Sequence, residues 1–208
     1  MAVIFDMDGV VSDTQRIHAR LESEILASYG ITMSIEEITR RFSGVSLREQ
    51  FQAVFRESSI PCPDLAAISK LKTARFAECS DEIVEIPGTR ECVEMLHPRM
   101  PLAIGSGSRL ATIERVLGKL ELRDRFRVIT SAEEVERGKP APDIFLLAAK
   151  RLGVEASRCT VIEDGISGML AAKAAGMRCI ALSNGYHTEY PADLVVSNLR
   201  EVPLEYFL

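Results

Sequence analysis

The chain has 208 residues, of which 47% are hydrophobic and 26% are charged, and its formal net charge is −5. These are the proportions of a globular protein, and they exclude a disordered or a collagen-like chain. Because the charge balance is acidic and no run rich in Lys and Arg occurs, we expect no nucleic-acid partner.

Export and membrane insertion are not expected either. No apolar stretch reaches the length of a transmembrane helix. The N-terminal segment has no basic residues, and its apolar run is interrupted by Asp6, which is unlike a signal peptide. The 5 cysteines are odd in number and include no C-x-x-C pair, so neither a disulfide framework nor a zinc site is indicated. We therefore expect a cytoplasmic protein with reduced thiols and no membrane partner.

Short apolar runs followed by polar residues recur along the chain. They cover residues 2–5, 101–105, 126–130, 159–162 and 179–182. Helical patterns lie between the later ones, at residues 108–117, 142–152 and 167–175. Strands that alternate with helices indicate βαβ units. The sequence therefore predicts an α/β fold with a doubly wound parallel sheet.

One segment breaks this alternation. From residue 14 to residue 83 the pattern is helical throughout, with turn signals at Gly30, Gly44 and Pro61–Pro63. We predict two domains: an α/β domain made of residues 1–13 and 84–208, and a small all-helical domain made of residues 14–83. The second domain is inserted after the first strand.

Polar residues stand at the carboxyl ends of several predicted strands. Asp6 and Asp8 follow the first strand, Ser106 follows the second, and Glu163 and Asp164 follow the run at 159–162. In an open parallel sheet, ligands bind outside the carboxyl ends of the strands, where the strand order switches. We therefore expect these side chains to form one site.

The chain resembles the haloacid dehalogenase-like hydrolases at four motifs, which occur in the same order as in that family. Asp6-Met7-Asp8-Gly9 matches the first motif, D-x-D-G, and Ser106 matches the second. Lys139 matches the third motif, and Glu163-Asp164 matches the fourth. The resemblance covers the whole chain. It implies that the sheet is a Rossmann-like core and that the helical insert is the family's mobile cap.

The resemblance implies a phosphatase that works through an aspartyl-phosphate. Asp6 is the expected nucleophile. Asp8 is the expected general acid for the leaving oxygen, and then the base that activates water. Lys139 and the hydroxyl of Ser106 are expected to supply the positive charge and the donor that a phosphoryl group needs during transfer.

The resemblance also implies Mg²⁺ as the cofactor. Asp6 and Asp164 are expected to supply side-chain oxygens and Asp8 its backbone carbonyl. Glu163 is expected to act through water or as an outer partner. The chemistry is consistent, because converging carboxylates repel one another and a hard divalent cation relieves that repulsion. Gly165 departs from the family, in which many members have a serine after the Glu-Asp pair.

Within the insert, the resemblance is to the β-phosphoglucomutase-like group of sugar-phosphate phosphatases and mutases. His18 lies where those mutases have a histidine that helps to gate the acid/base aspartate, and residues 42–46 resemble the group's cap loop. The mutases continue with an arginine for the distal phosphate, but Leu47 stands at that position and Arg48 follows it. The predicted substrate-binding residues are His18, Gly44, Arg48, Lys72 and Gly107.

Three functions remain open at this stage. The first is a phosphatase acting on a small phosphorylated metabolite, such as a sugar or sugar-acid phosphate, and we expect it to be a monomer. The second is a sugar phosphomutase, which Leu47 disfavours because a mutase must hold a second phosphate. The third is a phospho-acceptor signalling module, which is disfavoured because the first two acids are spaced by one residue and the adjacent pair comes last.

Overall fold

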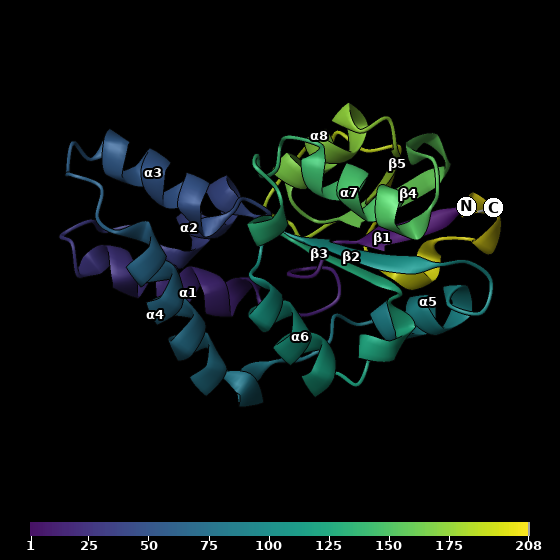
Figure 1. The fold of residues 1–208 in the computed structure, drawn as a ribbon, viewed down its shortest axis with the longest axis horizontal. Coiled ribbons are helices and arrows are strands. Elements are labelled where there is room, and N and C mark those ends of the chain that lie inside the picture. The colour runs from purple at the N-terminus through teal and green to yellow at the C-terminus, as the bar shows by residue number, and fades with distance from the viewer. Residues whose placement is uncertain (208) are drawn as a thin grey trace.

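A single parallel sheet of six strands forms the centre of the protein, shown as a computed structural model in which residues 1–207 are described (Figure 1). The strand order is β3-β2-β1-β4-β5-β6. The first strand, β1 (Ala2–Phe5), is buried along its whole length, as expected of a central strand covered on both faces. The other strands are β2 (Leu102–Ser106), β3 (Val128–Ser131), β4 (Cys159–Glu163), β5 (Arg178–Leu182) and β6 (Leu194–Val196).

The strand order switches at β1, which pairs with β2 on one side and with β4 on the other. The chain builds one half of the sheet outward from β2 to β3, and then crosses to build the other half from β4 to β6. A switch of this kind leaves a crevice outside the carboxyl ends of the central strands. Asp6, Ser106 and Glu163 lie at those ends.

Helices cover both faces of the sheet, which confirms the predicted doubly wound α/β fold. Two separate apolar clusters flank the strands. One contains residues of α5 (Thr89–Leu96) and α6 (Leu110–Lys119), and the other contains residues of α7 (Asp143–Leu152) and α8 (Ile166–Ala174). In Figure 1, α5 and α6 lie below the sheet and α7 and α8 above it.

Four helices between β1 and α5 form a block with its own apolar cluster. The cluster includes Leu26, Phe51, Phe55 and Ile68. Figure 1 shows this four-helix block beyond the edge of the sheet toward which β1 runs. Its members are α1 (Gln15–Ala27), α2 (Ile35–Phe42), α3 (Leu47–Glu57) and α4 (Leu65–Glu78). The predicted boundaries of a separate domain, 14 and 83, bracket these helices and stay a prediction.

Side-chain caps explain why three helices of the block begin where they do. Ser34, Ser46 and Asp64 precede α2, α3 and α4, and each accepts a hydrogen bond from a backbone N–H in the first turn. Such caps satisfy donors that have no partner within the helix. None of the helices in residues 1–207 is long and apolar enough to cross a membrane.

Candidate active site

Three buried carboxylates and one buried lysine meet at the carboxyl edge of the sheet. Asp6 follows β1, Glu163 ends β4 and Asp164 follows it, and one oxygen of each lies within 4.8 Å of the others. Lys139, in the loop before α7, places its Nζ 2.6 Å from both Asp6 Oδ1 and Glu163 Oε1. Residues from three distant parts of the chain therefore form one charged cluster, which we call the acid cluster.

The acid cluster carries more negative charge than its lysine balances. Although burial favours the neutral amine, Asp6 and Glu163 hold the pKa of Lys139 well above its usual value. Burial and the charge of Glu163 raise the pKa of Asp164 to about 7, against hydrogen bonds from Asn184 and Gln15. Burial also raises the pKa of Asp6, and the neighbouring acids add to this rise while Lys139 opposes it.

The donor set of the acid cluster fits a hard divalent cation. Asp164 Oδ1 is buried and accepts no hydrogen bond, whereas Asp164 Oδ2 is 3.2 Å from the Asn184 amide nitrogen that donates to it. Gly9 has φ of +90°, and a Cβ on it would overlap the Asp164 carboxylate, so only glycine lets the loop pass this close. An oxygen without a partner beside other carboxylates is the type of ligand that Mg²⁺ prefers.

Glu163 is arranged differently from the other two acids. Its Oε1 accepts a hydrogen bond from Lys139, and its Oε2 accepts one from the backbone N–H of Gly165 at 2.8 Å. Both oxygens are therefore engaged by the protein itself. A Cβ on Gly168 would overlap this carboxylate, so the first turn of α8 also holds Glu163 in place. This geometry suits an outer partner that orients the cluster.

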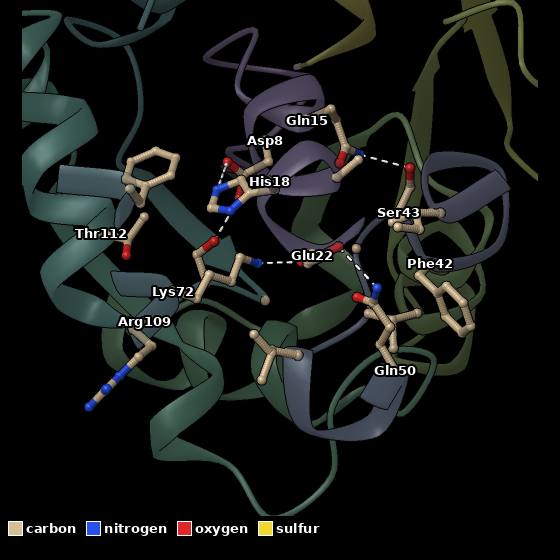
Figure 2. A pocket seen from close by; sticks show the side chains of 18 of the residues that line it. Asp8, Gln15, His18, Glu22, Phe42, Ser43, Gln50, Lys72, Arg109 and Thr112 are labelled. Carbon is tan, nitrogen blue, oxygen red and sulfur yellow. Dashed lines mark hydrogen bonds and ion pairs between the residues drawn. The ribbon is translucent and has the colours of Figure 1, made fainter. Parts of the chain in front are cut away.

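Asp8 lies in the same loop as Asp6 but has a different set of hydrogen-bond donors, and Figure 2 shows it beside His18. Its Oδ1 accepts a hydrogen bond from Thr14 and lies 3.1 Å from His18 Nε2, and its Oδ2 accepts a hydrogen bond from Ser108 at 2.8 Å. Burial favours the neutral acid, but the charge of His18 and these donors hold the pKa of Asp8 below its usual range. The two acids of the first loop thus have opposite pKa shifts.

The loop between α2 and α3 closes over the acid cluster. The Ser43 carbonyl accepts a hydrogen bond from Ser167 at 2.6 Å, and the Ser43 hydroxyl accepts one from Gln15 at 2.8 Å. A Cβ on Gly165 would lie only 2.8 Å from the Ser43 carbonyl oxygen, and one on Gly107 would lie 3.0 Å from the Gly44 carbonyl oxygen. Gly165 therefore makes room for this loop.

A cavity lies between the four-helix block and the acid cluster, and most of the predicted site residues border it. Ser106 is buried at the end of β2, and Lys139 is buried beside Asp6. Neither side chain lines the cavity. Ser106 accepts a hydrogen bond from the backbone N–H of Ser108 at 3.1 Å. The predicted residues that line the cavity are Asp6, Asp8, His18, Gly44, Lys72 and Gly107.

Arg48 does not belong to this group. Its side chain is exposed and is not part of the cavity wall, whereas Leu47 lines the cavity. Both residues are in the first turn of α3, where neighbouring residues point about 100° apart. The expectation that Arg48 contacts the substrate is therefore not supported by its position.

Several residues of the site were not predicted from the sequence. Ser108, Asn184 and Gln15 contact Asp8 or Asp164, and Glu22 and Gln50 line the cavity. Asn184 follows the end of β5, so the rule that function gathers at the carboxyl ends of strands could have identified it. Glu22 is four residues after His18 on α1, so helical spacing could have indicated that it shares the face of His18.

Comparison with known proteins identifies the family to which the chain belongs. Residues 3–182 match the family model described as haloacid dehalogenase-like hydrolase. The chain is 35% identical to the fructose-1-phosphate phosphatase YqaB of Escherichia coli (strain K12), over 86% of this chain and 94% of that protein. It is 30% identical to hexitol phosphatase B of the same organism, over 97% of this chain and 94% of that protein.

Solved structures agree with the sequence relatives. A crystal structure of β-phosphoglucomutase from Clostridium difficile superimposes with a TM-score of 0.85 at 27% identity, covering 99% of this chain and 94% of that chain. The chain belongs to the haloacid dehalogenase-like hydrolase family. Within that family it is a phosphoric monoester hydrolase, as are the two Escherichia coli relatives by name.

Proposed function

We propose that the protein is a Mg²⁺-dependent phosphatase that hydrolyses a small phosphorylated metabolite, a sugar or sugar-acid phosphate, through an aspartyl-phosphate on Asp6. The acid cluster carries this proposal: Asp6 lies beside a buried cation and two further acids, and Asp8 is held two residues away by its own donors. The similarity to a fructose-1-phosphate phosphatase and to a hexitol phosphatase supports a carbohydrate phosphate as the substrate.

In the proposed reaction, a carboxylate oxygen of Asp6 attacks phosphorus as the bond to the leaving oxygen breaks. Asp8 gives its proton to that oxygen, and then takes a proton from the water that attacks the phosphorus of the aspartyl-phosphate. This second step releases phosphate and restores Asp6. Asp8 can hold a proton only when some of its contacts with Thr14, His18 and Ser108 loosen, because these contacts favour its anion.

The remaining residues of the cluster have supporting roles. Lys139 would offset the charge that collects on Asp6 and on the phosphoryl oxygens, and Ser106 would supply a hydroxyl donor. Asp6 and Asp164 would bind Mg²⁺, helped by the carbonyl of Asp8, and Glu163 would orient the cluster. Bound Mg²⁺ supplies positive charge to the phosphate oxygens as they gain charge.

We further propose that residues 14–83 act as a cap. The loop around Ser43 and Gly44 meets the core at Ser167, Gly107 and Gly165, so its closure would exclude water from the acid cluster. The same block supplies most of the cavity wall away from the carboxylates, and would therefore choose the substrate.

The second candidate is a sugar phosphomutase, and the similarity to β-phosphoglucomutase favours it. Leu47 argues against it, because this apolar side chain lines the cavity where a mutase would need a cation for a second phosphate. Analysis of the products separates the two: a phosphatase releases inorganic phosphate, whereas a mutase converts one phosphosugar into an isomer.

The test of the main proposal is phosphate release from a panel of phosphosugars, sugar-acid phosphates, nucleotides and phosphoglycolate. Each is measured with Mg²⁺, with EDTA, and with an Asp6→Asn variant. We expect release that requires Mg²⁺ and is lost in the variant. Release that survives Asp6→Asn would exclude Asp6 as the nucleophile, and isomerisation without release would favour the mutase.

A further inference from the structure

The far wall of the cavity contains a partly buried ion pair that the proposed reaction does not use. Glu22 on α1 and Gln50 on α3 are both buried, and Lys72 comes from α4. One oxygen of Glu22 accepts a hydrogen bond from Lys72, and the other accepts one from Gln50 Nε2 at 2.9 Å. Figure 2 shows the three side chains together, beside His18. We call them the distal triad.

The distal triad lies one helical turn beyond the contact between His18 and Asp8. His18 and Glu22 are four residues apart on α1, and both side chains border the cavity. Residues with this spacing lie on one face of a helix, about 6 Å apart along its axis. A substrate whose phosphate lies at Asp6 would therefore direct its opposite end toward the distal triad.

Positive charge on the cavity wall is already paired. Among the described residues that line the cavity, those able to carry positive charge are His18, Lys72 and Arg109. His18 faces Asp8 and Lys72 faces Glu22. Arg109 pairs with Glu133, with 2.7 Å between their nearest charged atoms. An anionic group at the far end of a substrate would have to compete with a carboxylate for each of these cations.

The rest of the wall suits a group that is polar but uncharged. Thr39, Ser69, Thr73 and Gln50 border the cavity. The hydroxyls of Thr39 and Thr73 donate to backbone carbonyls of their own helices, so they can accept a hydrogen bond from a substrate hydroxyl. Apolar side chains, among them Phe42 and Leu47, complete the wall. Hydroxyl and amide groups exchange hydrogen bonds with the hydroxyls of a polyol without the cost of burying an unpaired charge.

We propose that Glu22 is a specificity-determining residue that restricts the enzyme to phosphate esters of neutral polyols, such as sugars and sugar alcohols. It neutralises Lys72 and repels a second phosphate or a carboxylate at the far end of the substrate. Selectivity of this kind needs a repulsive element as well as attractive contacts, and Glu22 supplies it. This inference rests on the proposed phosphatase function and narrows its substrate class.

The test compares kcat/KM for matched pairs of esters: fructose 1-phosphate with fructose 1,6-bisphosphate, and sorbitol 6-phosphate with 6-phosphogluconate. p-Nitrophenyl phosphate, which has no polyol end, reports on the acid cluster alone. The variants are Glu22→Gln, Lys72→Met and the control Glu24→Gln, which changes an exposed glutamate on the same helix. The ratio within each pair does not depend on the fraction of enzyme that is active.

In each pair, we expect the wild type to have a kcat/KM about tenfold or more higher for the ester whose far end is uncharged. This is the effect of one nearby charge at intermediate dielectric. Glu22→Gln should reduce that preference by about tenfold, because it leaves Lys72 free to bind an anion. Lys72→Met should increase the preference, and Glu24→Gln should leave it unchanged. If Glu22→Gln does not fold, Lys72→Met decides the question alone.

A wild type that prefers the anionic members would overturn the inference about Glu22, and so would variants whose ratios equal that of the control. In both cases hydrolysis of p-nitrophenyl phosphate would persist, so the proposed phosphatase function would stand. Failure to hydrolyse any ester, p-nitrophenyl phosphate included, would instead overturn the proposed function together with the inference.

Discussion

Replacing Lys139 with alanine should both abolish activity and strongly destabilise the protein. The Lys139 ammonium is fully buried and donates to two carboxylates at 2.6 Å, so its loss leaves buried acids without their cation. Breaking one side of a buried ion pair costs about 3–5 kcal/mol. For a chain of this size, each kcal/mol lowers Tm by about 2–4 °C, so the expected fall is about 6–20 °C.

The assay is thermal unfolding in EDTA and again in excess Mg²⁺. Mg²⁺ should raise the Tm of Lys139→Ala more than that of the wild type, because the variant's acid cluster has one positive charge fewer. The matched control is Lys119→Ala, which breaks an exposed pair with Asp81 and should cost less than about 1 kcal/mol. A fall in Tm no larger than that of the control, or an equal gain from Mg²⁺ in variant and wild type, would refute this reasoning.

Three further predictions concern the same site. Gly9→Ala should reduce kcat/KM by about 10²-fold, because the added methyl displaces the Asp164 carboxylate, whereas Gly118→Ala, in open space on α6, should leave steady-state kinetics unchanged. In EDTA, Tm should fall as the pH rises from 5 to 8, because the pKa of Asp164 is higher in the folded protein than in the unfolded chain and the buried acid loses its proton over this range. Asp164→Asn should make this fall shallower. Ser108→Ala removes a donor that lowers the pKa of Asp8, so Asp8 should keep the proton that it gives to the leaving oxygen up to a higher pH, and the alkaline limb of the kcat/KM profile should move to higher pH; a limb that stays in place would contradict this role.

Much of the core could be predicted because a parallel sheet leaves a strong pattern in the sequence. Strands buried on both faces appear as short apolar runs, and the runs at residues 2–5 and 159–162 correspond closely to β1 and β4. The polar residues that follow such runs must meet at one edge, which is how Asp6 and Asp164 were placed together. The edge strand β6 was missed because three residues are too few for a periodic pattern.

The substrate side of the site could not be predicted in the same way. Glu22 and Gln50 are 28 residues apart on different helices, and no spacing rule brings them together. Only the packing of the four-helix block does so. Arg48 shows the opposite problem. It was predicted to bind substrate because it is basic and follows the position of the mutase arginine, but one residue along a helix changes the direction of a side chain by about 100°, and Arg48 is exposed to solvent.

The contact between the four-helix block and the core has a consequence for how the substrate specificity of such an enzyme can change. The closing loop presents backbone carbonyls of Ser43 and Gly44, and it meets the core at Gly107, at Gly165 and at the hydroxyl of Ser167. Closure therefore depends little on the side chains that the helices direct into the cavity. Residues such as Glu22 can be replaced, in evolution or in the laboratory, while the loop around Ser43 and Gly44 and the catalytic groups beneath it stay unchanged.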